Sequence, residues 1–452
     1  MATHTGQPET SAAAPTRRQV LAGGAAIGGA ALVGGFPAII KARAAEKALS
    51  FWQFYAPGGA VPSQSAWFET MVKAWNDTHD IKVQLQYVPN GDYMNGTKLP
   101  TAFASGQGPD IFLISPGDFL RYYNGGVLQD LTPYIDAHTQ ADFAPGVIAS
   151  RKVGDKIYGV PMEVEPMAMY YRKDFFDKAG IKEGDVPQTW DQLLEVAKKL
   201  TTSDRFGLLF ETTPGYYQNF TWYPFMWQGG GDFQTAEGKS ALNVPGTVQA
   251  LKFWQDAVKS GAAPRKPLGG GGWDIVPNLG SGYCAMQNCG IWGISSLQAG
   301  AKDVPYGVFK LPTPPGGKYV TVGGGWAIVA NARGSNADTA GQFCAWALAS
   351  ASPESTQRMV DWCTVAKSDM PPRQSAFERG KVAFESGMLK FFADQIYPGT
   401  RSEPRVPPQV YKIVSDAIQA CQLNGADPAQ QAEAASQRLD AFLTGYKGAK
   451  IL

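Results

Sequence analysis

Histidine is almost absent from this chain. Only His4, His79 and His138 occur among 452 residues, and three isolated histidines give neither the spacing of a zinc site nor that of a Ser-His-Asp triad. Nucleotide-binding glycine motifs are also missing, because no Gly-x-Gly-x-x-Gly leads from an expected strand into a helix and no Gly-x4-Gly-Lys-Ser/Thr occurs. These absences argue against zinc enzymes, triad hydrolases and nucleotide-dependent enzymes.

Cysteine is scarce as well. The cysteines are Cys284, Cys289, Cys344, Cys363 and Cys421. Their number is odd, so at least one is unpaired or pairs between chains. Cys284 and Cys289 fall in an expected strand, where five residues place them roughly 16 Å apart, too far for a disulfide. Cys344 and Cys363 could meet between packed helices. No Cys-x-x-Cys pair occurs, and no cysteine precedes Cys284, so we expect no redox motif and no lipid anchor.

The beginning of the chain has the order of a secretory signal. Arg17 and Arg18 precede a glycine-diluted apolar run over residues 20–40, and Ala42-x-Ala44 offers a peptidase its small residues. The paired arginines resemble the twin-arginine type, whose cargo is exported already folded. The alternative is a membrane anchor, because the run is about long enough to span a bilayer. We expect cleavage after Ala44.

Length and charge limit what remains after cleavage. Removing residues 1–44 removes four basic residues and one acidic residue, which takes the formal charge from +1 to −2. A nearly neutral protein has no electrostatic footprint for nucleic acid or an anionic membrane. The remaining chain is longer than one core usually organises, so we expect two domains.

Aromatic residues are abundant, with 12 tryptophans, 18 tyrosines and 23 phenylalanines. Several occur beside Gly, Asn, Gln and Pro rather than in periodic apolar runs, most densely over residues 216–224. We interpret this segment as loop-like, with rings that stack against a flat and partly apolar molecule.

Strand and helix patterns alternate along the chain. Residues 49–54 and 81–87 predict strands on either side of a helix over 67–75, which is a βαβ unit and implies a parallel sheet. Thr189 and Gln192 form a capping box before an apolar stripe that ends at Leu200. We expect further strands at 110–115, 283–288, 306–309 and 326–330, and helices at 339–348, 410–421 and 428–443. The chain is therefore α/β, with a glycine loop at 269–272 and a domain crossing at 311–317.

Two carboxylates, Glu163 and Glu165, are two residues apart. In an extended strand they share a face roughly 6–7 Å apart, so a glycoside-cleaving pair is geometrically allowed. Acidic pairs more often serve as hydrogen-bonding groups, which is the interpretation we favour.

Five sequence blocks occur in one order. In chain order they are residues 104–111, 155–176 together with 187–191, 284–292, 323–328 and 370–373. In this order and spacing the chain resembles the family 1 extracellular solute-binding proteins of ABC importers, which include the maltodextrin-binding proteins. The resemblance covers nearly all of residues 49–445.

The resemblance implies a two-lobed periplasmic-binding-protein fold of type II, each lobe a mixed sheet flanked by helices. Mapped onto this sequence, lobe one is 45–161 and 312–366, and lobe two is 162–311 and 367–452. Hinge crossings join the lobes, and a ligand closes the cleft between them. The resemblance implies no catalysis and no cofactor.

The family's ligand-binding positions can be carried over individually. Glu165 falls where maltodextrin binders use a carboxylate against sugar hydroxyls, and Trp292 where an indole stacks on a pyranose. Ser115 and Asp118 lie in a loop after a strand, where the family's aromatic residue is replaced by Ile114; this argues against maltose itself. Other ligand-binding candidates by position are Trp52, Tyr55, Glu163, Trp222, Trp227, Trp273, Gly324, Gly325, Trp326 and Arg373.

The sequence thus predicts a monomeric periplasmic protein that binds a carbohydrate and delivers it to the permease subunits of an ABC importer. One alternative is a charged ligand. Glu163, Glu165 and Asp118 would favour an amino sugar or another cation, whereas Arg373 or Arg401 would favour a phosphate or sulfonate. A secreted glycan-cleaving enzyme and a receptor that docks on a chemosensor are the remaining alternatives.

Overall fold

The structure is a computed structural model that describes residues 48–94 and 97–451. The expected signal sequence, 1–44, lies outside these residues. Within the described ranges, none of the helices has both the length and the apolar character needed to cross a membrane.

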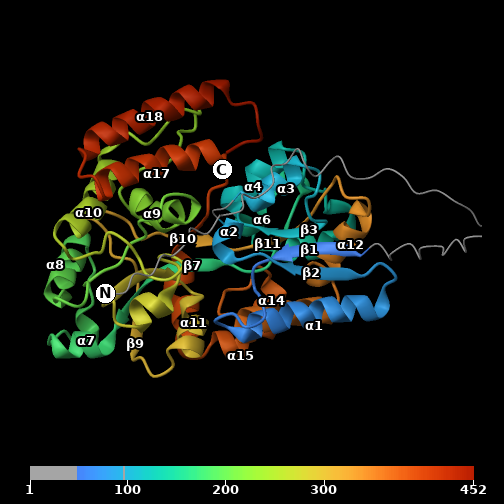
Figure 1. Cartoon of the computed structure of the whole chain (residues 1–452), viewed down its shortest axis with the longest axis horizontal. Coiled ribbons are helices and arrows are strands. Elements are labelled where there is room, and N and C mark those ends of the chain that lie inside the picture. The colour runs from blue at the N-terminus through green and yellow to red at the C-terminus, as the bar shows by residue number, and fades with distance from the viewer. Residues whose placement is uncertain (1–47, 95–96, 452) are drawn as a thin grey trace, which may run out of the picture. The chain divides into compact units, whose positions relative to one another are not determined.

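Two mixed five-stranded sheets organise the described chain (Figure 1). The first sheet has the order β2 (Val83–Tyr87), β1 (Leu49–Gln53), β3 (Ile111–Ile114), β11 (Ala327–Ala330) and β6 (Val160–Pro161). The second has the order β12 (Thr400–Ser402), β10 (Thr321–Gly324), β7 (Glu165–Arg172) and β8 (Met286–Gly290), with β9 (Tyr306–Phe309) also paired to β7. A small hairpin joins β4 (Lys152–Val153) and β5 (Lys156–Ile157).

Helices flank both sheets. Before β7 they are α1 (Pro62–Thr78), α2 (Asn90–Met94), α3 (Lys98–Ala104), α4 (Pro116–Asn124), α5 (Ala137–Asp142) and α6 (Pro145–Ala149). Between β7 and β9 they are α7 (Lys173–Lys178), α8 (Trp190–Leu200), α9 (Tyr216–Gln228), α10 (Pro245–Lys259) and α11 (Gly293–Gly300). After β11 they are α12 (Ala337–Leu348), α13 (Pro353–Asp361), α14 (Gln374–Arg379), α15 (Lys381–Phe384), α16 (Gly387–Phe391), α17 (Pro408–Gln422) and α18 (Pro428–Gly445). Short helical turns are η1 (Thr132–Tyr134), η2 (Glu183–Asp185), η3 (Val276–Gly280), η4 (Trp362–Ala366), η5 (Phe392–Ile396) and η6 (Tyr397–Gly399).

The strongly periodic segments fold as their patterns predict. Strands β1 and β2 are parallel and flank α1, whose buried face includes Trp67, Met71 and Trp75. The capping box forms at the start of α8, where the Gln192 amide N–H donates to the Thr189 hydroxyl and the Gln192 side chain accepts from the Thr189 amide. The expected strand at 283–288 is shifted, because β8 begins at Met286.

The sequence analysis interpreted residues 216–224 as loop-like, and this interpretation is wrong, because they form most of helix α9. Every residue of α9 is buried, including Pro224 in its interior. Because the helix is buried on all sides, its sequence shows no amphipathic stripe and its periodicity is hidden. Two of its polar side chains bond to α17: Asn219 donates to the Ser415 hydroxyl at 3.1 Å, and Gln218 donates to Gln422 at 3.2 Å.

The chain changes sheets at two short passages that lie against each other. Residues 162–164 lead from β6 in the first sheet to β7 in the second, and residues 325–326 lead from β10 back to β11. Residues 367–370 run beside the first passage, where the Val164 and Met370 backbones exchange hydrogen bonds. Strand β10 therefore belongs to the second sheet although 312–324 was assigned to lobe one; the division into lobes itself stays a prediction.

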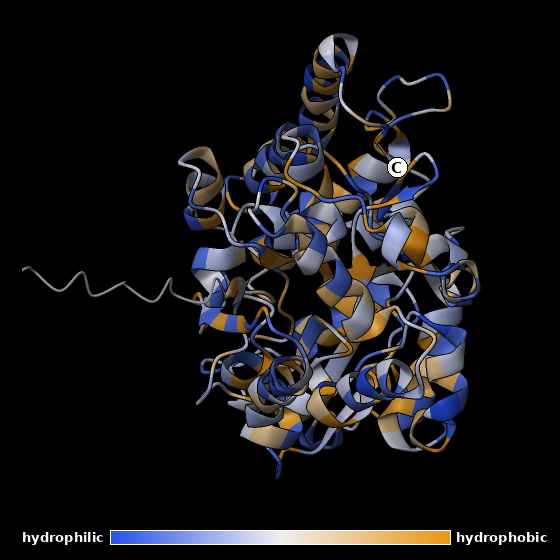
Figure 2. Ribbon diagram, turned by 90° about the vertical axis from the view of Figure 1, so that its right-hand side faces the viewer, coloured by the Kyte–Doolittle hydropathy of each residue, from blue (hydrophilic) through white to orange (hydrophobic). Residues whose placement is uncertain are grey.

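Apolar side chains fill the interior around both sheets. Strands β3 and β11 are buried at every position, and Figure 2 shows hydrophobic residues concentrated on the inner strands and hydrophilic residues on outer loops. All five cysteines are buried and free, so the Cys344–Cys363 pairing considered above does not form.

Candidate ligand pocket

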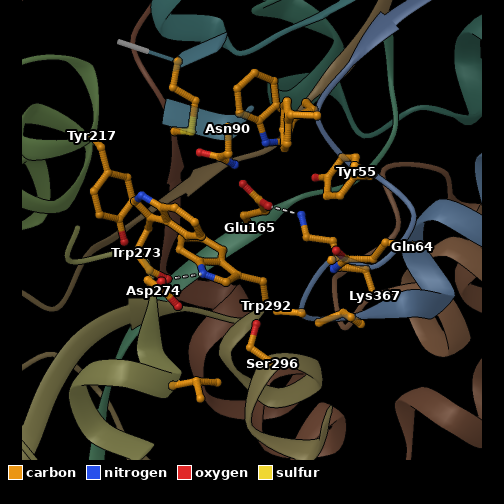
Figure 3. A pocket seen from close by; sticks show the side chains of 18 of the residues that line it. Tyr55, Gln64, Asn90, Glu165, Tyr217, Trp273, Asp274, Trp292, Ser296 and Lys367 are labelled. Carbon is orange, nitrogen blue, oxygen red and sulfur yellow. Dashed lines mark hydrogen bonds and ion pairs between the residues drawn. The ribbon is translucent and has the colours of Figure 1, made fainter. Parts of the chain in front are cut away.

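A cavity of about 300 Å³ is lined by segments that belong with both sheets (Figure 3). The segments that follow β1 and β2 contribute Phe54, Tyr55, Ala56, Gly59, Ala60, Val61, Gln64, Asn90 and Met94. Strand β7, α9 and the region from 273 to 296 contribute Glu165, Tyr216, Tyr217, Phe220, Trp273, Asp274, Val276, Trp292 and Ser296, and the lining is completed by Trp326 and Lys367. The volume is at the lower end of the range of small-molecule pockets, which favours a short ligand.

Aromatic rings dominate the lining, and hydrogen bonds hold two of the indoles in place. The Trp292 indole N–H donates to the Trp273 carbonyl at 3.1 Å, and the Trp273 indole N–H donates to the Gly270 carbonyl at 3.1 Å. Both side chains remain partly exposed and line the cavity, so part of each ring is open to a bound molecule. Trp326 packs edge-on against Phe54 with a centroid separation of 4.8 Å.

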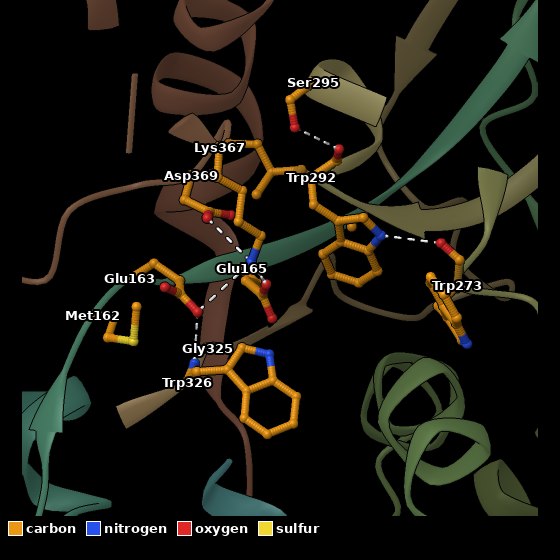
Figure 4. A network of polar contacts seen from close by, with 12 residues as sticks. Met162, Glu163, Glu165, Trp273, Trp292, Ser295, Gly325, Trp326, Lys367 and Asp369 are labelled. Carbon is orange, nitrogen blue, oxygen red and sulfur yellow. Dashed lines mark hydrogen bonds and ion pairs between the residues drawn. The ribbon is translucent and has the colours of Figure 1, made fainter. Parts of the chain in front are cut away.

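A buried cluster of four charged residues adjoins the pocket, and we call it the Lys367 cluster (Figure 4). Lys367 Nζ forms ion pairs with Glu165 Oε1, with Asp369 Oδ2 at 3.3 Å and with Glu163 Oε1 at 3.7 Å. Of the four side chains, only those of Glu165 and Lys367 line the cavity. One cation thus faces three carboxylates, and all four side chains are largely buried.

Burial and mutual repulsion perturb the proton affinities of this cluster. Burial raises the pKa of Glu163 to about 7 and raises the pKa of Asp369 well above its usual range, although Lys367 opposes both shifts. Burial alone would lower the pKa of Lys367, but Asp369, Glu163 and Glu165 together outweigh it, so its pKa is raised. Lys367 is therefore charged at neutral pH.

Glu163 lies behind the pocket and connects neighbouring segments. Its Oε1 accepts the Trp326 amide N–H at 2.8 Å, and its Oε2 accepts the Trp362 indole N–H at 2.5 Å. Glu163 is fully buried and does not line the cavity. The carboxylates of Glu163 and Glu165 therefore do not flank one substrate-sized space, as a glycoside-cleaving pair requires.

A second buried set of charges, Arg151 and Glu403, lies near the same passages. Glu403 Oε1 accepts the Gly117 amide N–H at 3.1 Å, and its Oε2 accepts the hydroxyl of the pocket residue Tyr216 at 3.2 Å. Arg151 donates to the Gly325 carbonyl at 2.5 Å. Burial raises the pKa of Glu403 to about 8 and lowers that of Arg151 to about 10.

The structure brings part of the predicted site together. The predicted residues that line the cavity are Tyr55, Glu165, Trp273, Trp292 and Trp326. The predicted residues that do not line it are Trp52, Ser115, Asp118, Glu163, Trp222, Trp227, Gly324, Gly325 and Arg373.

The tryptophans outside the cavity have other surroundings. Trp222 lies in α9 and is 1% exposed. The guanidinium of Arg401 lies over the Trp227 ring, 4.4 Å from the ring centroid. Trp52 lies on β1 with Lys98 Nζ 5.8 Å from its ring centroid. Arg401 also pairs with Asp232 at 2.7 Å, so it is not a pocket residue.

The segment after β3 was expected to be a loop, but α4 begins there at Pro116, so Gly117 and Asp118 lie in the first turn of a helix and contact other protein groups. Asp118 forms an ion pair with Arg121 at 3.4 Å, and Glu403 accepts the Gly117 amide N–H. Arg373 pairs with Asp142 at 2.6 Å and also donates to two backbone carbonyls, which matches the structural salt bridge considered as its alternative role.

Gly324 and Gly325 are explained by protein packing. A Cβ atom at Gly325 would lie 2.2 Å from the Glu163 carbonyl oxygen, and the φ angle of Gly325 is +125°. A Cβ atom at Gly324 would lie 2.6 Å from the Phe220 ring. Both glycines let the passage between β10 and β11 approach its neighbours closely.

Sequence reasoning missed several pocket residues, above all Lys367 and Asp274. Lys367 has no local motif, and its burial among carboxylates arises only from tertiary structure. Asp274 had a weak signal, because it follows the predicted Trp273 and the glycine loop. The sequence analysis identified residues 216–224 as rich in aromatic residues, but it did not predict that Tyr216 and Tyr217 lie in a helix.

Comparison with known proteins agrees with this architecture. A family model described as bacterial extracellular solute-binding protein matches residues 59–352. A Brucella abortus (strain 2308) protein with only the general description of a binding protein is 23% identical over 389 residues, covering 83% of this chain and 90% of the relative.

Two solved structures share the fold. One is an ABC transporter solute-binding protein of Thermotoga lettingae TMO bound with alpha-D-tagatose, with a TM-score of 0.74, 22% identity and coverage of 88% of this chain and 100% of that one. The other is UgpB from Mycobacterium tuberculosis in complex with glycerophosphocholine, with a TM-score of 0.71, 19% identity and coverage of 88% and 98%. The two sheets with their flanking helices are thus the two-lobed fold of periplasmic binding proteins, and the chain belongs to the bacterial extracellular solute-binding protein family.

Proposed function

We propose that this protein is the periplasmic substrate-binding subunit of an ABC importer and that it captures a carbohydrate by closing its two lobes around the pocket. The observation that carries the proposal is the arrangement of Trp273, Trp292 and Trp326 around the Glu165 carboxylate in one cavity. The face of a sugar ring is apolar and its rim is polar, so indole faces combined with a carboxylate acceptor match both parts.

The size of the cavity supports a monosaccharide or a short oligosaccharide over a long glycan, because its volume of about 300 Å³ is small for a binding pocket. Catalysis is not part of the proposal, since Glu163 is committed to the Trp326 amide and the Trp362 indole. A phosphate or sulfonate ligand is not supported, because the two arginines that suggested it are paired with acids. Arg373 pairs with Asp142, and Arg401 pairs with Asp232.

The proposed location and partners follow from the same reasoning. We propose export by the twin-arginine route, cleavage after Ala44 and no lipid anchor, so that a monomer shuttles between its sugar and the permease subunits. Arg17 and Arg18 support the route. Export of an Arg17→Lys, Arg18→Lys double variant would test it: accumulation of the precursor in the cytoplasm is expected, and normal export would refute the route.

Ligand capture can be tested by a thermal-shift screen of mono- and oligosaccharides, followed by calorimetry and analysis of the recovered sugar. A bound sugar should raise the melting temperature and be recovered unchanged. The radius of gyration in solution should fall on saturation as the lobes close. Cleavage of the sugar, abolished by Glu165→Gln, would overturn the proposal, and so would the absence of any binding carbohydrate.

A further inference from the structure

The pocket contains one cationic side chain, and that cation is already surrounded by acids. Lys367 Nζ has three carboxylates within 3.7 Å, as many as it has N–H donors. It is the only lysine or arginine that lines the cavity within the described part of the chain. A ligand anion would therefore find no available cation at this site.

A second carboxylate of the pocket, Asp274, has no such partner. None of the described residues forms an ion pair with it, and its carboxylate accepts the Gly270 amide N–H, which donates to Oδ2 at 3.2 Å. Partial burial raises the pKa of Asp274, because burial without a counter-cation disfavours the charged form. Figure 3 shows Asp274 on the side of the pocket that carries Trp273 and Tyr217, apart from Lys367.

A third observation on this side of the pocket is an unpartnered hydroxyl. The Tyr217 side chain lines the cavity and is 6% exposed, and its Oη atom has no hydrogen-bond partner. Buried polar groups are nearly always hydrogen-bonded, so this one is left for a ligand. The negative faces of the neighbouring aromatic rings add a further attraction for positive charge.

The formal charge around the cavity is negative as long as Asp274 is ionised. Even when Glu163 and Asp369 are both protonated, Lys367 offsets Glu165 and leaves the charge of Asp274 uncompensated. Placing an anion there would add like-charge repulsion to desolvation, whereas a cation would form a charge-assisted hydrogen bond.

We propose that the ligand is a sugar that carries a positively charged nitrogen, an amino sugar, whose ammonium group binds at Asp274, on the side of the pocket that Tyr217 also lines, while its ring stacks on Trp292. This inference rests on the proposed function and narrows its substrate class. Asp274 is then a specificity-determining residue, since it distinguishes an amine from a hydroxyl at the same position of the sugar.

Matched sugar pairs test the inference on the unmodified protein. Calorimetry would compare D-glucosamine with D-glucose, D-galactosamine with D-galactose, and chitosan disaccharide with cellobiose. N-acetyl-D-glucosamine serves as a neutral analogue, D-glucose 6-phosphate as an anion and choline as a cation without a sugar. At least one amine should bind about tenfold or more tightly than its neutral partner, and the phosphate should not bind.

Variants then assign the preference to one residue. Asp274→Asn should remove the difference between amine and neutral sugar, whereas Asp303→Asn, an exposed carboxylate outside the pocket with the same change in charge, should keep it. A neutral sugar that binds as tightly as its amine would overturn the inference and leave the proposed function standing. Binding of choline but of no sugar in the panel or the wider screen would overturn both. If no panel member binds, the inference is overturned, and the proposed function falls only if the wider screen also finds no carbohydrate that binds.

Discussion

Lys367 and Arg151 are both buried cations close to the passages between the sheets, and they differ in what compensates their charge. Lys367 has three carboxylates within 3.7 Å. Arg151 forms no ion pair with any described residue and instead donates to the Gly325 carbonyl and the Ser150 hydroxyl. The pKa values respond in opposite directions, since that of Lys367 is raised and that of Arg151 is lowered to about 10.

The difference indicates different roles. In the Lys367 cluster, a single cation partly compensates three buried carboxylates. Without this cation, burying the carboxylates would cost more free energy. Arg151 mainly satisfies the backbone at the Gly325 passage, so its hydrogen bonds matter more than its charge. Substitutions should therefore separate effects on stability from effects on binding.

The largest effect is expected from Lys367→Met, which leaves three buried carboxylates without a cation. The free energy of unfolding should fall by about 3–5 kcal/mol at pH 8, as measured by urea denaturation. The loss should be smaller at pH 5, where the carboxylates can protonate. A loss of the same size at both pH values would show that Lys367 contributes by packing alone and would remove its contrast with Arg151.

Next in size is the effect of Trp292→Ala on ligand affinity. The stacking face beside the Lys367 cluster would be lost, and binding should weaken by about 1.5–3 kcal/mol, as measured by calorimetry with a sugar found in the screen. Trp222→Phe is the matched control, because Trp222 is buried away from the cavity. An unchanged dissociation constant for a folded Trp292→Ala protein would refute the stacking role.

A smaller effect is expected from Arg151→Met, which leaves the Gly325 carbonyl without this donor. The free energy of unfolding should fall by about 1–3 kcal/mol, with little change in ligand affinity because Arg151 does not line the cavity. If Arg151→Met weakened binding as much as Trp292→Ala does, the assignment of Arg151 to stability would be wrong.

The last prediction concerns the pH dependence of stability. The pKa values of Glu163 and Glu403 are raised to about 7 and about 8 from an ordinary value of 4.5. A raised carboxyl pKa contributes stability that is complete below pH 4.5 and is lost as the pH rises through the folded value. The free energy of unfolding, measured from pH 5 to 8, should decline as the pH rises, and Glu403→Gln should make this decline shallower. An identical profile for Glu403→Gln would contradict the raised pKa of Glu403.

The sequence allowed the framework of the fold to be predicted better than its buried charges. Strand β1, helix α1 and strand β2 have clear periodicities, because each presents one face to the core. Helix α9 lacks such a pattern, since all its sides are buried. Glu165 and Trp292 could be placed through the family resemblance, whereas Lys367 and Asp274 depend on packing between segments distant in the sequence.

The passages between the sheets also determine when each sheet can be completed during synthesis. The first sheet needs β11 between β3 and β6, and the second needs β12 beside β10. Residue 330 must leave the ribosome before the first sheet has all its strands, and residue 402 before the second does. The nascent chain therefore carries unpaired strand edges until residue 330 has emerged for the first sheet and until residue 402 has emerged for the second.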